Sequence, residues 1–173
     1  MSNSKSHRIR LGMVGGGQGA FIGAVHRIAS RLDDRYELVA GALSSQAERA
    51  LESGRQLSLA DDRCYTSYEE MAQSEKARED GIEAVAIVTP NHLHFGPVKT
   101  FLEAGFHVIC DKPVTTTLDE ARQLSQIIAD SGQLFILTHN YTGYPMVRQM
   151  REMIAAGEIG KLRHVQVEYA QDW

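Results

Sequence analysis

The sequence has little cysteine, no excess of positive charge and no long apolar run, and each shortage excludes a class of protein. Its two cysteines, Cys64 and Cys110, are too few for a disulfide framework and lack metal-ligand spacing, so we expect reduced thiols, a cytoplasmic location and no metal site. A formal net charge of -4 gives no basic surface for nucleic acid or a membrane. The longest apolar runs, such as Ala84 to Val88, are too short to span a bilayer.

A glycine-rich turn follows the first apolar run and precedes the amphipathic segment Phe21 to Leu32, which is the order of strand, turn and helix. Within it, Gly15-x-Gly17-x-x-Ala20 matches the dinucleotide-binding fingerprint. We expect Gly15 to make the sharp turn, Gly17 to admit a pyrophosphate and Ala20 to let the helix pack closely on the strand. Gln18, in the same turn, is predicted to contact the cofactor. The helix start offers free N–H groups to the phosphates.

Strands and helices alternate along the chain, which predicts an α/β fold, a Rossmann-type doubly wound parallel sheet with helices on both faces. The later strands are expected at residues 36–43, 63–65, 82–88, 106–110 and 134–137. Helices are expected at residues 46–56 and 118–130, and a further helix begins after His94 and ends at Ala104. Ser67-Tyr-Glu-Glu70 is a capping box that predicts a short helix, and the charged segment Ser74 to Asp80 is expected to be solvated surface.

The chain divides into two predicted domains. Residues 1–138 form the NAD(P)-binding domain, and residues 139–173 begin a C-terminal domain for substrate binding or oligomerisation. The second part shows a helix at Pro145 to Ala156 and an alternating strand at Leu162 to Trp173. A strand with no sheet leaves an unpaired edge, so we expect the chain to be a fragment of a longer enzyme.

The segment after the second strand is expected to select the cofactor. NAD-binding sites of this type carry an acid there that binds the ribose hydroxyls. This chain has Leu43 followed by Ser44 and Ser45, with Arg49 one turn into the next helix. Hydroxyls and an arginine suit a 2′-phosphate, so NADP is favoured over NAD. Ser44 or Ser45 capping the helix, with Glu48 at the capping-box position, is an equally good and compatible interpretation.

Further polar residues follow other strand ends, and the carboxyl ends of parallel strands are where such sheets bind ligands. The residues expected beside the nicotinamide are Thr89, Pro90 and Asn91. His94 is either part of this site, a local hydrogen-bonding group or a surface residue. His92 and His94 are two residues apart and do not share a helical face, which argues against a metal site. Asn140 lines the same cleft or caps the following helix.

Lys112 is the candidate catalytic residue. Pro113 fixes its own φ and favours an extended Lys112, so the lysine is expected to project from the strand end into the cleft. There it could hold a substrate hydroxyl and help to move its proton. The alternatives are a surface lysine in a turn or a lysine paired with Asp111.

These motifs together resemble those of the Gfo/Idh/MocA oxidoreductases, the glucose-fructose oxidoreductase and inositol dehydrogenase group. The resemblance rests on the glycine turn, on Thr89-Pro-Asn-His-Leu-His94, on Gly105-Phe-His-Val-Ile-Cys-Asp-Lys-Pro-Val114 and on Asn140-Tyr141. It implies a homo-oligomeric enzyme that uses NAD(P) to oxidise or reduce a sugar, polyol or related alcohol or ketone.

The resemblance also assigns individual residues. The family's Glu-Lys-Pro lysine is catalytic and lies near the nicotinamide, and it corresponds to Lys112, while Asp111 replaces the glutamate. Asp111 and Pro113 are accordingly expected on the cofactor side. Family members are about twice as long, and their downstream aspartate and histidine have no counterpart here, so the isolated chain is expected to be inactive. The competing hypothesis is a non-catalytic dinucleotide-binding sensor or scaffold.

Overall fold

The computed structural model describes residues 7–171. The chain forms two compact units, one ending at Thr138 and the other beginning at His139. None of the helices in the described range is long and apolar enough to cross a membrane.

Five parallel strands form the centre of the first unit, in the spatial order β2-β1-β3-β4-β5. Their bounds are β1 Ile9–Gly15, β2 Tyr36–Ala42, β3 Ala84–Val88, β4 His107–Cys110 and β5 Phe135–Leu137. The chain leaves β1 for β2 on one side and then crosses to β3 on the other, so the strand order reverses beside β1. The predicted doubly wound parallel sheet is confirmed. Sheets of this type bind ligands at the carboxyl edge where the strand order reverses, which here lies between β1 and β3.

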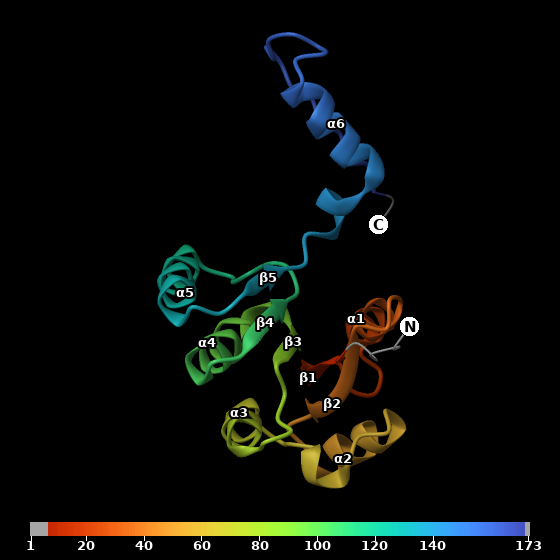
Figure 1. The fold of residues 1–173 in the computed structure, drawn as a ribbon, viewed down its shortest axis with the longest axis vertical. Coiled ribbons are helices and arrows are strands. Elements are labelled where there is room, and N and C mark those ends of the chain that lie inside the picture. The colour runs from red at the N-terminus through yellow and green to blue at the C-terminus, as the bar shows by residue number, and fades with distance from the viewer. Residues whose placement is uncertain (1–6, 172–173) are drawn as a thin grey trace, which may run out of the picture. The chain divides into compact units, whose positions relative to one another are not determined.

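Five helices connect these strands: α1 Phe21–Arg31, α2 Ala47–Gln56, α3 Tyr68–Ala77, α4 Phe95–Ala104 and α5 Leu118–Ser131. Figure 1 shows α3, α4 and α5 together on one side of the sheet and α1 on the other. The predicted cap at Ser67 is confirmed, because its hydroxyl accepts from the N–H of Glu70 at 3.1 Å. Gly105 and Gly132 end α4 and α5 in the left-handed conformation.

The core has two layers because side chains alternate across β3, whose five residues are all buried. Val85 and Ile87 belong to the cluster that includes Phe101 of α4. Ala84, Ala86 and Val88 belong to the other cluster, with Leu11 and Met13 of β1. A strand covered on both faces is almost continuously apolar, which is why this segment was recognisable from sequence.

The predicted strand at residues 63–65 is wrong. A 3-10 turn occupies Asp61–Arg63, and the segment pairs with β2 only through the bridge between Gly41 and Cys64. The position matches the third strand of the standard Rossmann order, but the segment is too short to extend because Ser67 already caps α3.

The prediction that Ser74 to Asp80 is all solvated surface is also wrong, because Glu75 is 1% exposed. Its carboxylate accepts from the Arg63 guanidinium, from the Tyr65 hydroxyl at 2.8 Å and from the Ile82 N–H at 3.0 Å. Burial and then the bond to Glu75 raise the pKa of Tyr65 well above its usual range. The buried pair therefore joins the segment after β2 to α3 and to the residues before β3.

The second unit begins with a 3-10 turn at Asn140–Gly143 and contains α6, Pro145–Ala155, as expected. The strand predicted at Leu162 to Trp173 is wrong for residues 162–171, which adopt no regular secondary structure, and residues 172–173 lie outside the described range. Strands are stable only when paired, and the described residues of this unit contain no other strand. The alternating side chains Val165, Val167 and Tyr169 are exposed.

Candidate functional site

A cavity of about 240 Å³ opens at the carboxyl edge of β1, β2 and β3. It brings together most of the residues singled out in the sequence after these three strands. Its lining residues are Gly15, Gly16, Gly17, Gln18, Ala20, Leu43, Ser44, Arg49, Ser53, Val88, Thr89 and Pro90.

The glycine turn has the geometry expected of a sharp strand-to-helix connection. Gly15 and Gly16 have φ values of 80° and 73°, a region that L side chains rarely adopt. A Cβ at Gly17 would lie 2.6 Å from the carbonyl oxygen of Leu43, so the turn packs directly on the end of β2. Gly17 is thus required by the fold as well as by the phosphate approach that the sequence suggests.

The close packing predicted for Ala20 occurs at other residues. Ala20 is the residue before α1, whereas a Cβ on Gly23 would lie 2.5 Å from the Cα of Gly16. The helix therefore touches the turn backbone one turn further along than the fingerprint indicated. Sequence reasoning missed Gly23, although a glycine inside a helix is itself a signal of close backbone approach.

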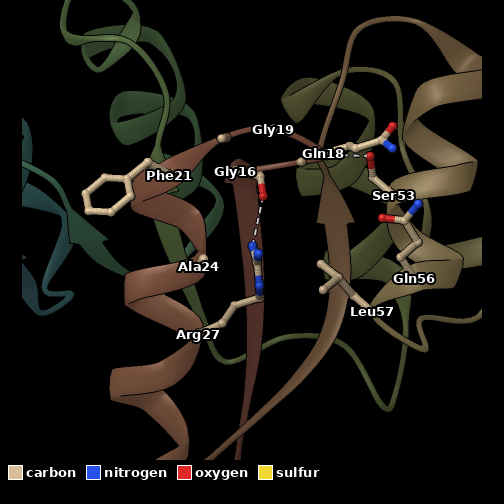
Figure 2. Close-up of a pocket in the computed structure, with 11 residues that line it drawn as sticks. Gly16, Gln18, Gly19, Phe21, Ala24, Arg27, Ser53, Gln56 and Leu57 are labelled. Carbon is tan, nitrogen blue, oxygen red and sulfur yellow. Dashed lines mark hydrogen bonds between the residues drawn. The ribbon is translucent and has the colours of Figure 1, made fainter.

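Two side chains from helices next to the glycine turn form hydrogen bonds with its backbone (Figure 2). Arg27 of α1 donates to the carbonyl of Gly16 at 2.8 Å, and the hydroxyl of Ser53 in α2 accepts from the N–H of Gln18 at 3.2 Å. Burial, and then the nearby charge of Arg31, lower the pKa of Arg27. These residues also line a neighbouring cavity of about 340 Å³, which shares residues of the turn with the first cavity. No pattern in the sequence marks Arg27 or Ser53.

The start of α1 suits an anion. Its first turn has no side-chain cap and no acidic residue. By contrast, Ser67 caps α3 and Thr117 caps α5. Free N–H groups at the end of an uncapped helix attract phosphates. The residues present therefore fit the pyrophosphate of a dinucleotide.

The capping role considered for Ser44 and Ser45 is wrong, because α2 begins after Gln46 and has no side-chain cap. The hydroxyl of Ser44 accepts from the N–H of Gln46 at 3.2 Å, a local turn outside the helix. Ser44 and Arg49 both line the cavity, with no carboxylate among its lining residues. Ser45 is exposed and is not among them, so its cofactor contact stays a prediction.

Thr89 and Pro90 line the cavity at the end of β3, while Asn91 is exposed in the 3-10 turn Asn91–Leu93 and does not line it. His94 is completely buried, and both of its ring nitrogens face backbone carbonyls. The surface alternative for His94 is therefore wrong. Its predicted direct contact with a cofactor is not supported by this arrangement.

Asp111 and Lys112 follow β4. Oδ1 of Asp111 accepts from the Thr138 hydroxyl at 2.8 Å and lies 3.6 Å from Nε2 of His26. Lys112 is exposed and, within residues 7–171, forms no ion pair with Asp111. The peptide bond between Lys112 and Pro113 is cis. Asn140 is exposed and belongs to the second unit, so its role in the site stays a prediction.

Comparison with known proteins agrees with the fold. Residues 9–139 match the sequence model of the Gfo/Idh/MocA group, described as an oxidoreductase family with an NAD-binding Rossmann fold. The chain belongs to the Gfo/Idh/MocA oxidoreductase family. The predicted resemblance is thereby confirmed.

Three proteins illustrate how similar this chain is to other known proteins. An oxidoreductase structure from Sinorhizobium meliloti is 64% identical, with a TM-score of 0.87 over 91% of this chain and 44% of its own. An inositol dehydrogenase homologue from Azotobacter vinelandii, solved with NAD+, is 42% identical, with a TM-score of 0.87 over 91% and 41%. D-xylose 1-dehydrogenase (NADP(+)) from Hypocrea jecorina is 38% identical over 74% of this chain and 32% of its own. The chain spans less than half the length of these relatives.

Proposed function

We propose that this chain supplies the cofactor-binding part of an enzyme that transfers hydride between NAD(P) and a sugar or polyol. The observation that carries the proposal is the convergence at one sheet edge. The uncapped start of α1, the glycine turn and the ends of β2 and β3 surround one cavity, and Lys112 follows the neighbouring strand β4. Relatives named for inositol and D-xylose point to a substrate with several hydroxyl groups.

Each part of the chain has a defined task in this proposal. The nicotinamide, when bound, supplies the hydride chemistry. The turn at Gly15 to Ala20 and the first turn of α1 bind the pyrophosphate through backbone N–H groups. Lys112 binds the reacting oxygen of the substrate and assists movement of its proton.

NADP is the proposed preference because of the cavity wall next to β2. Ser44 and Arg49 lie on this wall, and Leu43 stands where NAD-selective sites carry an acid. A hydroxyl and a guanidinium can bind a 2′-phosphate, whereas a carboxylate would repel it. The relatives include both an NADP-dependent enzyme and a structure with NAD+, so the preference rests on these side chains.

The test combines binding with turnover. Calorimetric titration of this chain with NAD and NADP should show binding, and the complete enzyme of the proposal should oxidise members of a panel of sugars and polyols with the preferred cofactor. In the active enzyme, Lys112→Ala should lower kcat by about 100-fold or more, as expected for loss of a proton-transfer group, and leave the cofactor Kd within about threefold. The matched control is Lys99→Ala on the surface of α4.

The outcomes separate the hypotheses. Cofactor binding without oxidation of any sugar or polyol would favour the sensor or scaffold function. Unchanged turnover in Lys112→Ala would remove the role of Lys112. A folded protein that binds neither dinucleotide would refute the proposal as a whole.

A further inference from the structure

His94 connects two loops at the carboxyl edge of the sheet. Its Nδ1 lies 2.6 Å from the carbonyl oxygen of Pro113, and its Nε2 lies 3.0 Å from the carbonyl oxygen of Thr89. The side chain is 0% exposed. Carbonyl oxygens only accept, so a neutral ring with its proton on Nδ1 donates to Pro113, the shorter contact, and a ring cation donates to both.

The two loops carry different parts of the proposed site. Thr89 follows β3 and lines the cavity beside the glycine turn. Pro113 comes directly after Lys112 in the loop that follows β4. The carbonyl of His94 also accepts from the N–H of Val98 at 3.1 Å, at the start of α4. One buried residue therefore joins the cavity loop, the lysine loop and a helix.

The position of Lys112 depends on its backbone. Its side chain is exposed and forms no hydrogen bond or ion pair within residues 7–171. On one side of it, the N–H of Asp111 donates to the carbonyl of Ile87 at 3.0 Å. On the other side, the Pro113 carbonyl is bound to His94. Lys112 thus lies between two anchored peptide groups, one tied to β3 and one tied to His94.

We propose that His94 is a positioning residue that fixes the backbone of Lys112 relative to the cofactor cavity. This inference rests on the proposed function of Lys112. His94 does not touch the reacting atoms, and it acts through the carbonyl of Pro113. A displacement of about 1 Å in a catalytic group can lower a rate by about 100-fold. Loss of the Pro113 contact should therefore lower kcat much more than it weakens cofactor binding.

Two matched substitutions separate the two contacts. His94→Asn places an amide nitrogen near the position of Nδ1 and keeps a donor for Pro113, whereas His94→Gln places one near Nε2 and keeps a donor for Thr89. We expect His94→Gln to lower kcat at least tenfold and to speed exchange at least tenfold in the segment that holds Lys112, read at the N–H of Asp111, which is hydrogen-bonded to the Ile87 carbonyl. Its Kd for NAD(P)H, measured by cofactor fluorescence, should stay within about threefold. His94→Asn should leave kcat and exchange of this segment within about threefold of the unaltered enzyme.

Equal losses in both variants, in proportion to a fall in Tm, would overturn the proposal and leave His94 a structural residue. An enzyme that oxidises no sugar would refute the proposed function, while the exchange rates would still decide whether His94 fixes the Lys112 segment. The unaltered protein gives a check that does not require either variant to fold. Nitrogen-15 NMR should show a slowly exchanging proton on Nδ1 of His94, and rapid exchange there would contradict the contact with Pro113.

Discussion

The hydroxyl of Thr138 donates a 2.8 Å hydrogen bond to the carboxylate of Asp111, joining the ends of β4 and β5. The N–H of Thr138 also donates to the carbonyl of Cys110 at 2.9 Å, so the strand ends are tied twice. Asp111 precedes Lys112, and this tie holds one side of the lysine loop. Thr138, the residue directly after the last strand of the first unit, is therefore part of the support of the proposed site.

Thr138→Val should show how much this contact stabilises the unit. The substitution keeps the side-chain shape and removes the donor, and hydrogen bonds to charged groups contribute about 1.5–3 kcal/mol. We expect the free energy of unfolding in urea to fall by about that amount. Thr138→Ser is the control, because it keeps the hydroxyl, and an equal loss in both variants would assign the effect to packing.

Gly17→Ala should weaken cofactor binding at least tenfold. The new Cβ would lie 2.6 Å from the carbonyl oxygen of Leu43, a backbone atom that cannot move without displacing the end of β2. Calorimetric titration with NAD and NADP measures the change. Gly143→Ala is the matched control, since its Cβ would meet nothing within 4 Å. Unchanged affinity in a folded Gly17→Ala variant would contradict the placement of the pyrophosphate at this turn.

Ser44→Asp should shift the cofactor preference from NADP towards NAD. The new carboxylate would lie on the cavity wall, where it repels a 2′-phosphate and can bind ribose hydroxyls. We expect the ratio of the NADP to the NAD dissociation constants to rise at least tenfold in calorimetry. Ser45→Asp adds the same charge at an exposed residue that does not line the cavity, and it should change the ratio less. Equal shifts in both variants would indicate a general charge effect.

Glu75→Ala should be strongly destabilising. The Glu75 side chain is 0% exposed and the Arg63 side chain 8%, so the substitution leaves a buried guanidinium without its partner. Breaking such a pair costs about 3–5 kcal/mol. Lys99→Ala breaks the exposed pair with Glu103 and should cost less than about 1 kcal/mol. Chemical denaturation measures the free energy of unfolding of both variants. A loss below about 1 kcal/mol for Glu75→Ala would contradict the buried pair.

Cys110 should make stability fall at alkaline pH. Burial, and then the charge of Asp111, raise the pKa of the Cys110 thiol to about 12. The unfolded thiol ionises near pH 8.5, so its stabilisation is complete below that pH and is lost as pH rises towards 12. Between pH 8 and 10 the unaltered protein should lose about 1.5–2 kcal/mol more than Cys110→Ala, measured by denaturation under reducing conditions. If the stability of the unaltered protein and that of Cys110→Ala fell in parallel with pH, the pKa of the folded thiol would not be raised.

The alternation of strands and helices, the glycine turn and the family resemblance could all be recognised from the amino-acid sequence. These features depend on local sequence. A buried strand such as β3 is an unbroken apolar run, and a glycine such as Gly105 ends a helix because it adopts the left-handed conformation easily. That residues after β1, β2 and β3 line one cavity was also predictable, since parallel strands present their carboxyl ends on a single edge.

The side chains that support that edge became identifiable only in the folded chain. Glu75 lies in a charged segment, and nothing in its neighbours shows that Arg63 and Tyr65 fold onto it. For His94 the sequence left a site residue, a local hydrogen-bonding group and a surface residue open, and the fold favours the second, because its ring nitrogens face the carbonyls of Thr89 and Pro113. Arg27, Gly23 and Ser53 support the glycine turn from other elements. Such contacts join residues far apart in the chain, and their partners are fixed by packing rather than by local sequence.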